Sequence, residues 1–243
     1  LNRIGMPVLE DDEERRLAVC RERLLAVRRR RVPPERDDKV LADWNGLMIA
    51  ALAEAGAVFA EPAWVETAAT VFRFVTTHMS EGGRLKHVWR AGQARHPAVL
   101  EDYANMAKAA LALYQVTAER GYLDQAIAWA GVADRHFHDD AAGGYFVSAD
   151  DTTDVIARPK SVADNAVPSG NGTMVEVLAM LFFATGETHY RERAERSVRL
   201  FSGTNPQYLL SIPGMLTGYE LLESGAQVVI VADPEDPAGV ALR

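Results

Sequence analysis

The sequence predicts an all-α fold in which helical hairpins stack into an (α/α) toroid with short β-hairpin inserts. Three stretches share one plan, in which polar residues at a helix start lead into a long apolar helix, and each is followed by an amphipathic helix. The aspartates at the three starts, Asp43, Asp102 and Asp164, recur about 60 residues apart. A repeat of this kind is typical of stacked helical hairpins.

Stacked hairpins can form an open solenoid or a closed toroid. Inner helices that are apolar on nearly all sides, β-hairpin inserts at one end and a unit longer than most solenoid repeats favour the toroid. We expect a single toroid-type domain over residues 1–243. A closed ring of six hairpins needs about 350 residues at this spacing. The ring is therefore incomplete here or completed by a second copy, and the start at Leu1 indicates part of a longer protein.

Four inner helices are expected, and the first is rich in Leu, Met, Ile and Ala. Pro168 at the start of the third is favoured because its missing N–H would be unpaired there anyway. The fourth is strained near Pro213-Gly214. The predicted inner helices span residues 43–59, 101–120, 168–185 and 206–223, and their amphipathic partners span residues 61–79, 122–137 and 188–202.

Shorter segments connect these helices. Residues 84–100 alternate in polarity around a turn at Ala91-Gly92 and predict a β-hairpin insert, without a larger sheet. Residues 142–160 predict a second hairpin with its turn near Asp150. A strand or extended tail is expected from Gln227.

Charge and composition exclude several functions. The net charge of −8 argues against a nucleic-acid-binding protein. The arginine run 28–31 ends a helix predicted over residues 10–31, whose acidic first turns offset it. The apolar face of that helix is formed by Leu17, Cys20, Leu24 and Val27. No apolar run approaches about 20 residues, so no membrane span is expected, and a cytoplasmic setting is the default. With one cysteine and no phosphate loop or dinucleotide motif, we expect no disulfide framework and no cofactor.

The hairpin topology predicts where a site would lie. Inner helices of antiparallel hairpins all point the same way, so their N-termini gather at one rim and present free N–H groups with partial positive charge. Polar residues at the helix starts would therefore line one mouth.

Three motifs at these starts identify a resemblance. DDKVLADWNGL, LEDYA and DNAVPSGN look like the C-terminal half of the thioredoxin-domain proteins that include spermatogenesis-associated members. That resemblance implies an (α/α) toroid similar to six-hairpin glycosidases and N-acylglucosamine 2-epimerase, joined in the family to a thioredoxin-like domain. It implies a site location but no particular reaction. This chain departs from the pattern because it lacks the thioredoxin-like part and the first hairpins.

Acids at the rim are the catalytic candidates. Glycoside chemistry needs one protonated and one charged carboxyl group. Glu101 and Asp102 diverge by about 100° on a helix, so Asp102 is expected to work with Asp43 or Asp164 from another hairpin. The alternative is that all of these acids only cap helix N-termini.

Other residues at the rim are candidates for binding a sugar. Trp44 and Asn45 offer an aromatic platform and an amide, with a buried core tryptophan as the alternative. His87 could reach over the mouth as an acid or base, as histidines do in sugar epimerases. No metal site is expected, although His136 and His138 lie beside two aspartates. The full set of binding candidates is Asp38, Trp44, Asn45, His87, Glu101, Tyr103, Ser169 and Asn171.

Two functions remain open. The first is a carbohydrate-active or sugar-binding domain of glycosidase or epimerase type. The second is a non-catalytic scaffold that docks a thioredoxin-like domain or another protein.

Overall fold

The chain divides into two compact units, residues 1–38 and 39–243. The computed structural model describes residues 5, 7, 10–153, 155–203 and 206–228. The first unit contains helix α1 (Asp11–Arg28), where the sequence predicts it, but none of the residues of this helix is buried and Cys20 is exposed. All the predicted helical hairpins lie in the second unit.

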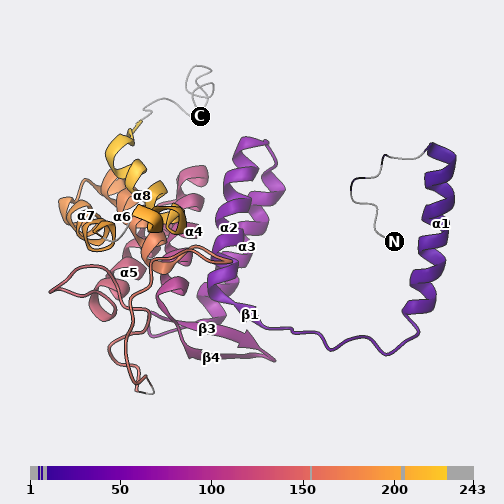
Figure 1. The fold of residues 1–243 in the computed structure, drawn as a ribbon, viewed down its shortest axis with the longest axis horizontal. Helices are drawn as coiled ribbons and strands as arrows, with labels where there is room; N and C mark the ends of the chain where they lie inside the picture. Colours follow the sequence, from indigo (N-terminus) through magenta and orange to yellow (C-terminus); the bar gives the residue numbers. More distant parts are fainter. Residues whose placement is uncertain (1–4, 6, 8–9, 154, 204–205, 229–243) are drawn as a thin grey trace. The chain divides into compact units, whose positions relative to one another are not determined.

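The second unit is a row of helical hairpins. Helices α2, α4, α6 and α8 pack each against the next, and α3, α5 and α7 pack on α2, α4 and α6 respectively (Figure 1). The prediction of a mainly helical fold with inner and outer helices is confirmed. No helix among the described residues is long and apolar enough to cross a membrane. The helices are α2 (Ala42–Val58), α3 (Pro62–His78), α4 (Leu100–Thr117), α5 (Arg120–His136), α6 (Gly170–Thr185), α7 (Thr188–Ser202) and α8 (Pro213–Ser224), with a 3₁₀ helix η1 (Pro206–Ser211) before α8.

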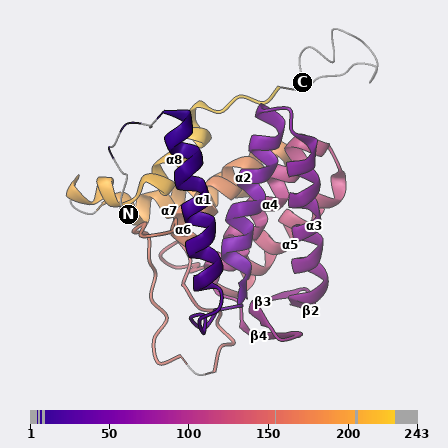
Figure 2. The ribbon, with the colours of Figure 1, turned by 90° about the vertical axis from the view of Figure 1, so that its right-hand side faces the viewer.

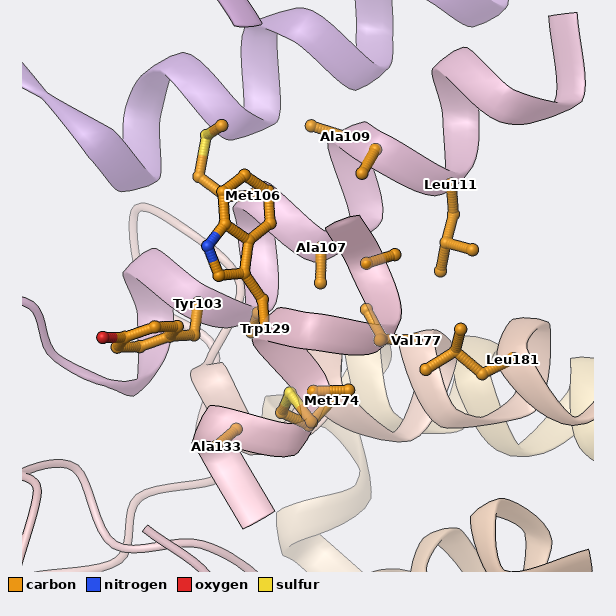
Figure 3. Packing of buried hydrophobic residues seen from close by; sticks show 14 of the residues in the cluster. Tyr103, Met106, Ala107, Ala109, Leu111, Trp129, Ala133, Met174, Val177 and Leu181 are labelled. Atoms are coloured by element: carbon orange, nitrogen blue, oxygen red, sulfur yellow. The ribbon is translucent and has the colours of Figure 1, made fainter. Parts of the chain in front are cut away.

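Helix α4 is the centre of the core because it packs against α2, α5 and α6. Small side chains allow these neighbours to approach closely, and Figure 3 shows Ala107 among the larger side chains of α5 and α6. At Gly46 of α2 an added Cβ would lie only 2.7 Å from the carbonyl carbon of Asn105. The buried alanines of α4 are Ala104, Ala107, Ala109, Ala110 and Ala112.

A small antiparallel sheet lies at the end of the second unit where α2 begins (Figures 1 and 2). The predicted hairpin with its turn at Ala91-Gly92 is confirmed, and both turn residues have positive φ. The expectation of an isolated hairpin is wrong, because β3 also pairs with two short flanking strands. The strands are β1 (Val40–Leu41), β2 (Ser80–Glu81), β3 (Arg84–Arg90) and β4 (Gln93–Pro97).

The second predicted hairpin, over residues 142–160, needs correction. Among its described residues, segment 142–160 forms no strand beyond one bridge between Tyr145 and His138. Side chains and isolated backbone hydrogen bonds hold this segment, and the Arg158 guanidinium donates to the carbonyls of Ser148 and His136.

At the third and fourth inner helices, helix starts also differ from the prediction. Pro168 precedes the N-cap Ser169 and lies outside α6. The predicted fourth inner helix is divided, because Ile212 adopts a non-helical conformation between η1 and α8. Most of the tail predicted from Gln227 lies outside the described residues.

The contact at Gly46 can be tested. We expect Gly46→Ala to lower the free energy of unfolding by about 1–3 kcal/mol, because backbone atoms of α4 would have to move away from the new methyl group. Gly131→Ala is the matched control, since nothing lies within 4 Å of a Cβ at that position in α5. It should raise stability by about 0.5–1 kcal/mol. Urea denaturation measures both, and equal stability of the two variants would contradict the close approach.

Candidate functional site

The starts of α2 and α4 are joined by a cluster of two aspartates and one histidine. Asp102 is fully buried in the first turn of α4, and its Oδ1 accepts the backbone N–H of Asp43 at 3.0 Å. Nδ1 of His87, from the middle of β3, lies 3.0 Å from each Asp102 oxygen. The structure thus brings together Asp43, His87 and Asp102, three residues that the sequence singled out separately.

The hydrogen bonds of Asp102 define the state of His87. The Oδ2 atom of Asp102 also accepts the backbone N–H of Val99, the residue that precedes α4. Both oxygens therefore face N–H donors, so the side chain acts as a carboxylate acceptor and Nδ1 of His87 must be the donor. In the neutral imidazole this leaves the lone pair on Nε2. The His87 side chain is 32% exposed, whereas that of Asp102 is inaccessible.

Charges around His87 favour its protonated form. The hydrogen bond to Asp102 raises the pKa of His87 above its ordinary value, and the charges of Asp102 and Asp43 add to this effect. Burial opposes the shift but does not cancel it. His87 is therefore suited to take up and hold a proton on Nε2 while Nδ1 stays bonded to Asp102.

Asp43 is less well satisfied than Asp102. It is 8% exposed, and its Oδ1 accepts the backbone N–H of Trp44 at 2.8 Å. Burial, followed by the charge of Asp102, raises the pKa of the Asp43 carboxyl above its ordinary value. The folded protein therefore holds a proton on Asp43 more tightly than the unfolded chain does.

Glu101 faces the other side of α4. Its Oε1 accepts the backbone N–H of Gly170, at the start of α6, over 3.4 Å. Its Oε2 is enclosed and has no hydrogen-bond partner. Burial raises the pKa of Glu101, and the charges of Asp102 and Asp43 raise it further.

Asp164 joins α6 to α8 instead of pairing with Asp102. Its two oxygens accept the backbone N–H groups of Ser169 at 2.8 Å and of Gly214 at 2.6 Å. Ser169 is the N-cap of α6, and its Oγ accepts the N–H of Gly172 and donates to the Val162 carbonyl. Asp164 and Ser169 therefore serve the starts of α6 and α8 and do not join the cluster of Asp43, His87 and Asp102.

Two further candidates hold loops in place. The Asn171 side chain is fully buried and exchanges two hydrogen bonds with the backbone of Tyr145. The Tyr103 hydroxyl accepts the backbone N–H of Leu85 and the Nε–H of Arg84. Both side chains support the structure around the cluster, and neither presents a free polar group.

The remaining candidates differ in exposure. Trp44 is 60% exposed beside Asp43, so the alternative of a buried core tryptophan is wrong. Asn45 donates its side-chain N–H to the Leu41 carbonyl at 2.7 Å. Asp38 is exposed and belongs to the first unit, whereas the cluster of Asp43, His87 and Asp102 belongs to the second.

Within the part of the chain that the structure describes, two clusters have the composition of a metal site. Asp43, His87 and Asp102 offer ligand atoms within 4.8 Å of one another, but N–H donors already occupy both oxygens of Asp102. The second cluster consists of His136, Asp150 and Asp151. The Arg84 guanidinium binds both oxygens of Asp151, a pairing that the sequence gave no local signal for because 67 residues separate the two. Hydrogen bonds therefore account for both clusters.

The fold defines a class of protein. A glycoside hydrolase family 76 α-mannanase of Bacteroides thetaiotaomicron is 14% identical and has a TM-score of 0.61. The match covers 77% of this chain and 53% of the mannanase. A cellobiose 2-epimerase of Spirochaeta thermophila is 16% identical and has a TM-score of 0.61. The match covers 79% of this chain and 55% of the epimerase. At these identities the likeness concerns the fold alone. The chain has the (α/α) toroid fold of these glycosidases and epimerases, as predicted.

Relatives with a higher sequence identity are spermatogenesis-associated proteins. Spermatogenesis-associated protein 20 of Rattus norvegicus is 32% identical over 226 residues, which cover 88% of this chain and 29% of the rat protein. The human protein of that name is 30% identical over 224 residues, which cover 87% of this chain and 28% of the human protein. The predicted resemblance is confirmed: spermatogenesis-associated proteins 20 are homologues of this chain. The chain spans less than a third of their length. No protein-family model matches it.

Replacing Asp102 tests its role as an acceptor. Asp102→Asn places an NH₂ group against backbone N–H donors, so we expect a loss of about 1–3 kcal/mol of unfolding free energy for the unsatisfied group. The pKa of His87 should fall at the same time. Urea denaturation and an NMR titration of the His87 ring measure the two effects. Asp124→Asn, at an exposed ion pair with Arg120, should change stability by less than about 0.5 kcal/mol.

Replacing Asp43 should raise the stability of the protein at neutral pH, whereas replacing Asp102 should lower it. Because folding raises its pKa, this carboxyl favours the folded state below its ordinary value of 3.8 and loses that contribution as pH rises through the folded value. Asp43→Asn should therefore have a higher Tm than the unsubstituted protein at pH 7–8, with the difference vanishing near pH 4. Thermal unfolding across this range measures it. A lower Tm at pH 8 would contradict the proposed desolvation of Asp43.

Proposed function

We propose that this chain carries a carbohydrate-active site of epimerase type in which His87 transfers a proton to and from a sugar carbon. The observation that carries the proposal is the hydrogen bond from His87 Nδ1 to a fully buried Asp102, which leaves Nε2 as the basic atom. Asp102 acts as a positioning residue, since it fixes the tautomer and stabilises the imidazolium without reaching the substrate. The toroid fold shared with a cellobiose 2-epimerase supports a sugar as the substrate.

The chemistry follows from the acidity of a C–H bond next to a carbonyl. In an open-chain sugar, Nε2 of His87 takes the proton from this carbon, and the C–H electron pair moves into an enediolate. Return of a proton to the opposite face inverts the carbon. An acid–base group with a pKa near neutrality is the most effective at such a transfer. The exposed ring of Trp44, next to Asp43, offers the apolar surface on which a sugar can stack.

A glycosidase is the second candidate, and the two carboxyl groups of Asp43 and Glu101 favour it. Both have pKa values raised by burial, and hydrolysis of a glycoside needs one carboxylic acid that keeps its proton. A family 76 α-mannanase has the same fold. This reaction would depend on Asp43 and Glu101 and not on His87.

The non-catalytic scaffold remains the alternative to both. It rests on the same family resemblance, in which a toroid accompanies a thioredoxin-like domain. Trp44, Met48 and Val58 provide an exposed apolar stripe along α2. A protein that neither binds nor converts any sugar, but captures an isolated thioredoxin-like domain, would favour this role.

Hydrogen exchange tests the epimerase proposal directly. The protein is incubated in D₂O with cellobiose, glucose, mannose or N-acetylglucosamine, and NMR follows the C2–H signal. We expect deuterium at C2 of one sugar, at a rate that His87→Asn lowers by about 100-fold or more. His136→Asn is the matched control, because His136 Nδ1 is bonded in the same way to Asp150, at 2.8 Å. It should exchange at the unsubstituted rate.

Two outcomes would favour a function other than epimerisation. Absence of exchange with every sugar, in a protein that releases reducing sugar from α-1,6-mannobiose, would favour the glycosidase, provided that Asp43→Asn abolishes the release. Absence of both reactions would favour the scaffold.

A further inference from the structure

The acids of α4 lie on two sides of its N-terminus. The Asp102 side chain turns toward α2 and β3, where it contacts Asp43 and His87. The Glu101 side chain turns toward α6, where it contacts Gly170. This divergence follows from the angle of about 100° between consecutive side chains on a helix. His87 therefore contacts one side of the start of α4, and the Glu101 carboxyl lies on another.

Contacts with Gly170 hold the Glu101 carboxyl in place. A Cβ at this position would lie 3.2 Å from Cδ of Glu101 and 2.9 Å from the Leu100 side chain. Only a glycine therefore leaves room for the carboxyl against the first turn of α6. The N–H of Gly170 then contacts Oε1 at 3.4 Å, which is too long for a strong bond.

The other carboxyl oxygen is the unusual feature. Asp102 receives three N–H donors on its two oxygens, whereas Oε2 of Glu101 is enclosed and receives none. An ionised carboxylate with an enclosed oxygen and no donor is costly, so this environment favours the neutral acid. One helical turn further along α4, both polar atoms of the buried Asn105 amide also lack a partner.

We propose that Glu101 is the second acid–base group of this site and delivers a proton to the sugar carbon on the face opposite to His87. The inference rests on the proposed epimerase function and deepens it. His87 Nε2 breaks the C–H bond and becomes an imidazolium, while the electron pair forms the enediolate. The O–H bond of Glu101 then breaks, its proton forms the new C–H bond, and Glu101 becomes a carboxylate. Solvent returns a proton to Glu101 and removes one from His87 before the next turnover.

The partly exposed position of Glu101 allows this transfer. The residue as a whole is only partly buried, although Oε2 is enclosed. Half a turn about the terminal bond of the side chain exchanges its two oxygens, and this torsion is broad and two-fold in glutamate. The proton can therefore move from the enclosed oxygen position to the one beside Gly170 without any backbone change.

Separating exchange from inversion tests the proposal. In D₂O, NMR measures two rates for the sugar identified above: entry of deuterium at C2 of recovered substrate, and formation of the epimer. Glu101→Gln keeps the shape of the side chain but cannot deliver a proton. We expect this variant to keep the exchange rate within about three-fold and to lose epimer formation by about 100-fold or more. Glu176→Gln is the control, because Glu176 forms an ion pair with Lys108 at 2.9 Å and should leave both rates unchanged.

Each other outcome overturns the proposal in a recognisable way. If Glu101→Gln forms the epimer at the unsubstituted rate, Glu101 is not the second group, while the role of His87 stands. If exchange and epimer formation fall together in a variant that unfolds at the normal temperature, Glu101 acts on the same step as His87 and not on the opposite face. If the unsubstituted protein exchanges no sugar, the proposed function itself fails.

Discussion

Acidic side chains at the starts of the inner helices hold the second unit together. Helix N-termini have unpaired N–H groups and a partial positive charge, so a carboxylate from a neighbouring helix satisfies both. Asp102 does this for α2, and Asp164, in the loop before α6, does it for α6 and α8, whereas Glu101 makes only a long contact with α6. Because each contact joins successive inner helices at the same end, these acids fix the relative positions of the helix starts. The candidate site is built on that end.

The same interaction explains why these acids are unequal. Asp102 is saturated with donors, fully buried and unable to reach a ligand, so its contribution is to orient His87. Asp43 and Glu101 have fewer donors and are disfavoured in their ionised forms. Groups of this kind reduce stability at neutral pH, and proteins retain such a cost most often where function requires it. Structural capping and chemistry are therefore divided among neighbouring residues of one motif.

Local patterns predicted most of the fold. Hydrophobic periodicity and the 60-residue repeat located six of the inner and outer helices because burial imposes those patterns directly. Segment 142–160 was predicted wrongly as a hairpin, since hydrogen bonds from distant side chains, such as Asn171 to Tyr145, hold it without a strand ladder. The division before α8 was predicted only as strain near Pro213-Gly214. Such tertiary contacts leave little trace in a local alternation of polar and apolar residues.

By itself, the sequence determined the hairpin repeat and the gathering of acids at one rim, because helix direction follows from chain connectivity. Only the tertiary structure decided which acids meet. Asp102 lies beside Asp43 and His87 because β3 carries the histidine across the start of α4, while Asp164 is held by Gly214 of α8. The sequence could not distinguish these pairings, since all three aspartates occupy equivalent positions in the repeat. The contacts between hairpins, which depend on how closely Gly46 and Gly170 let the helices approach, make them different.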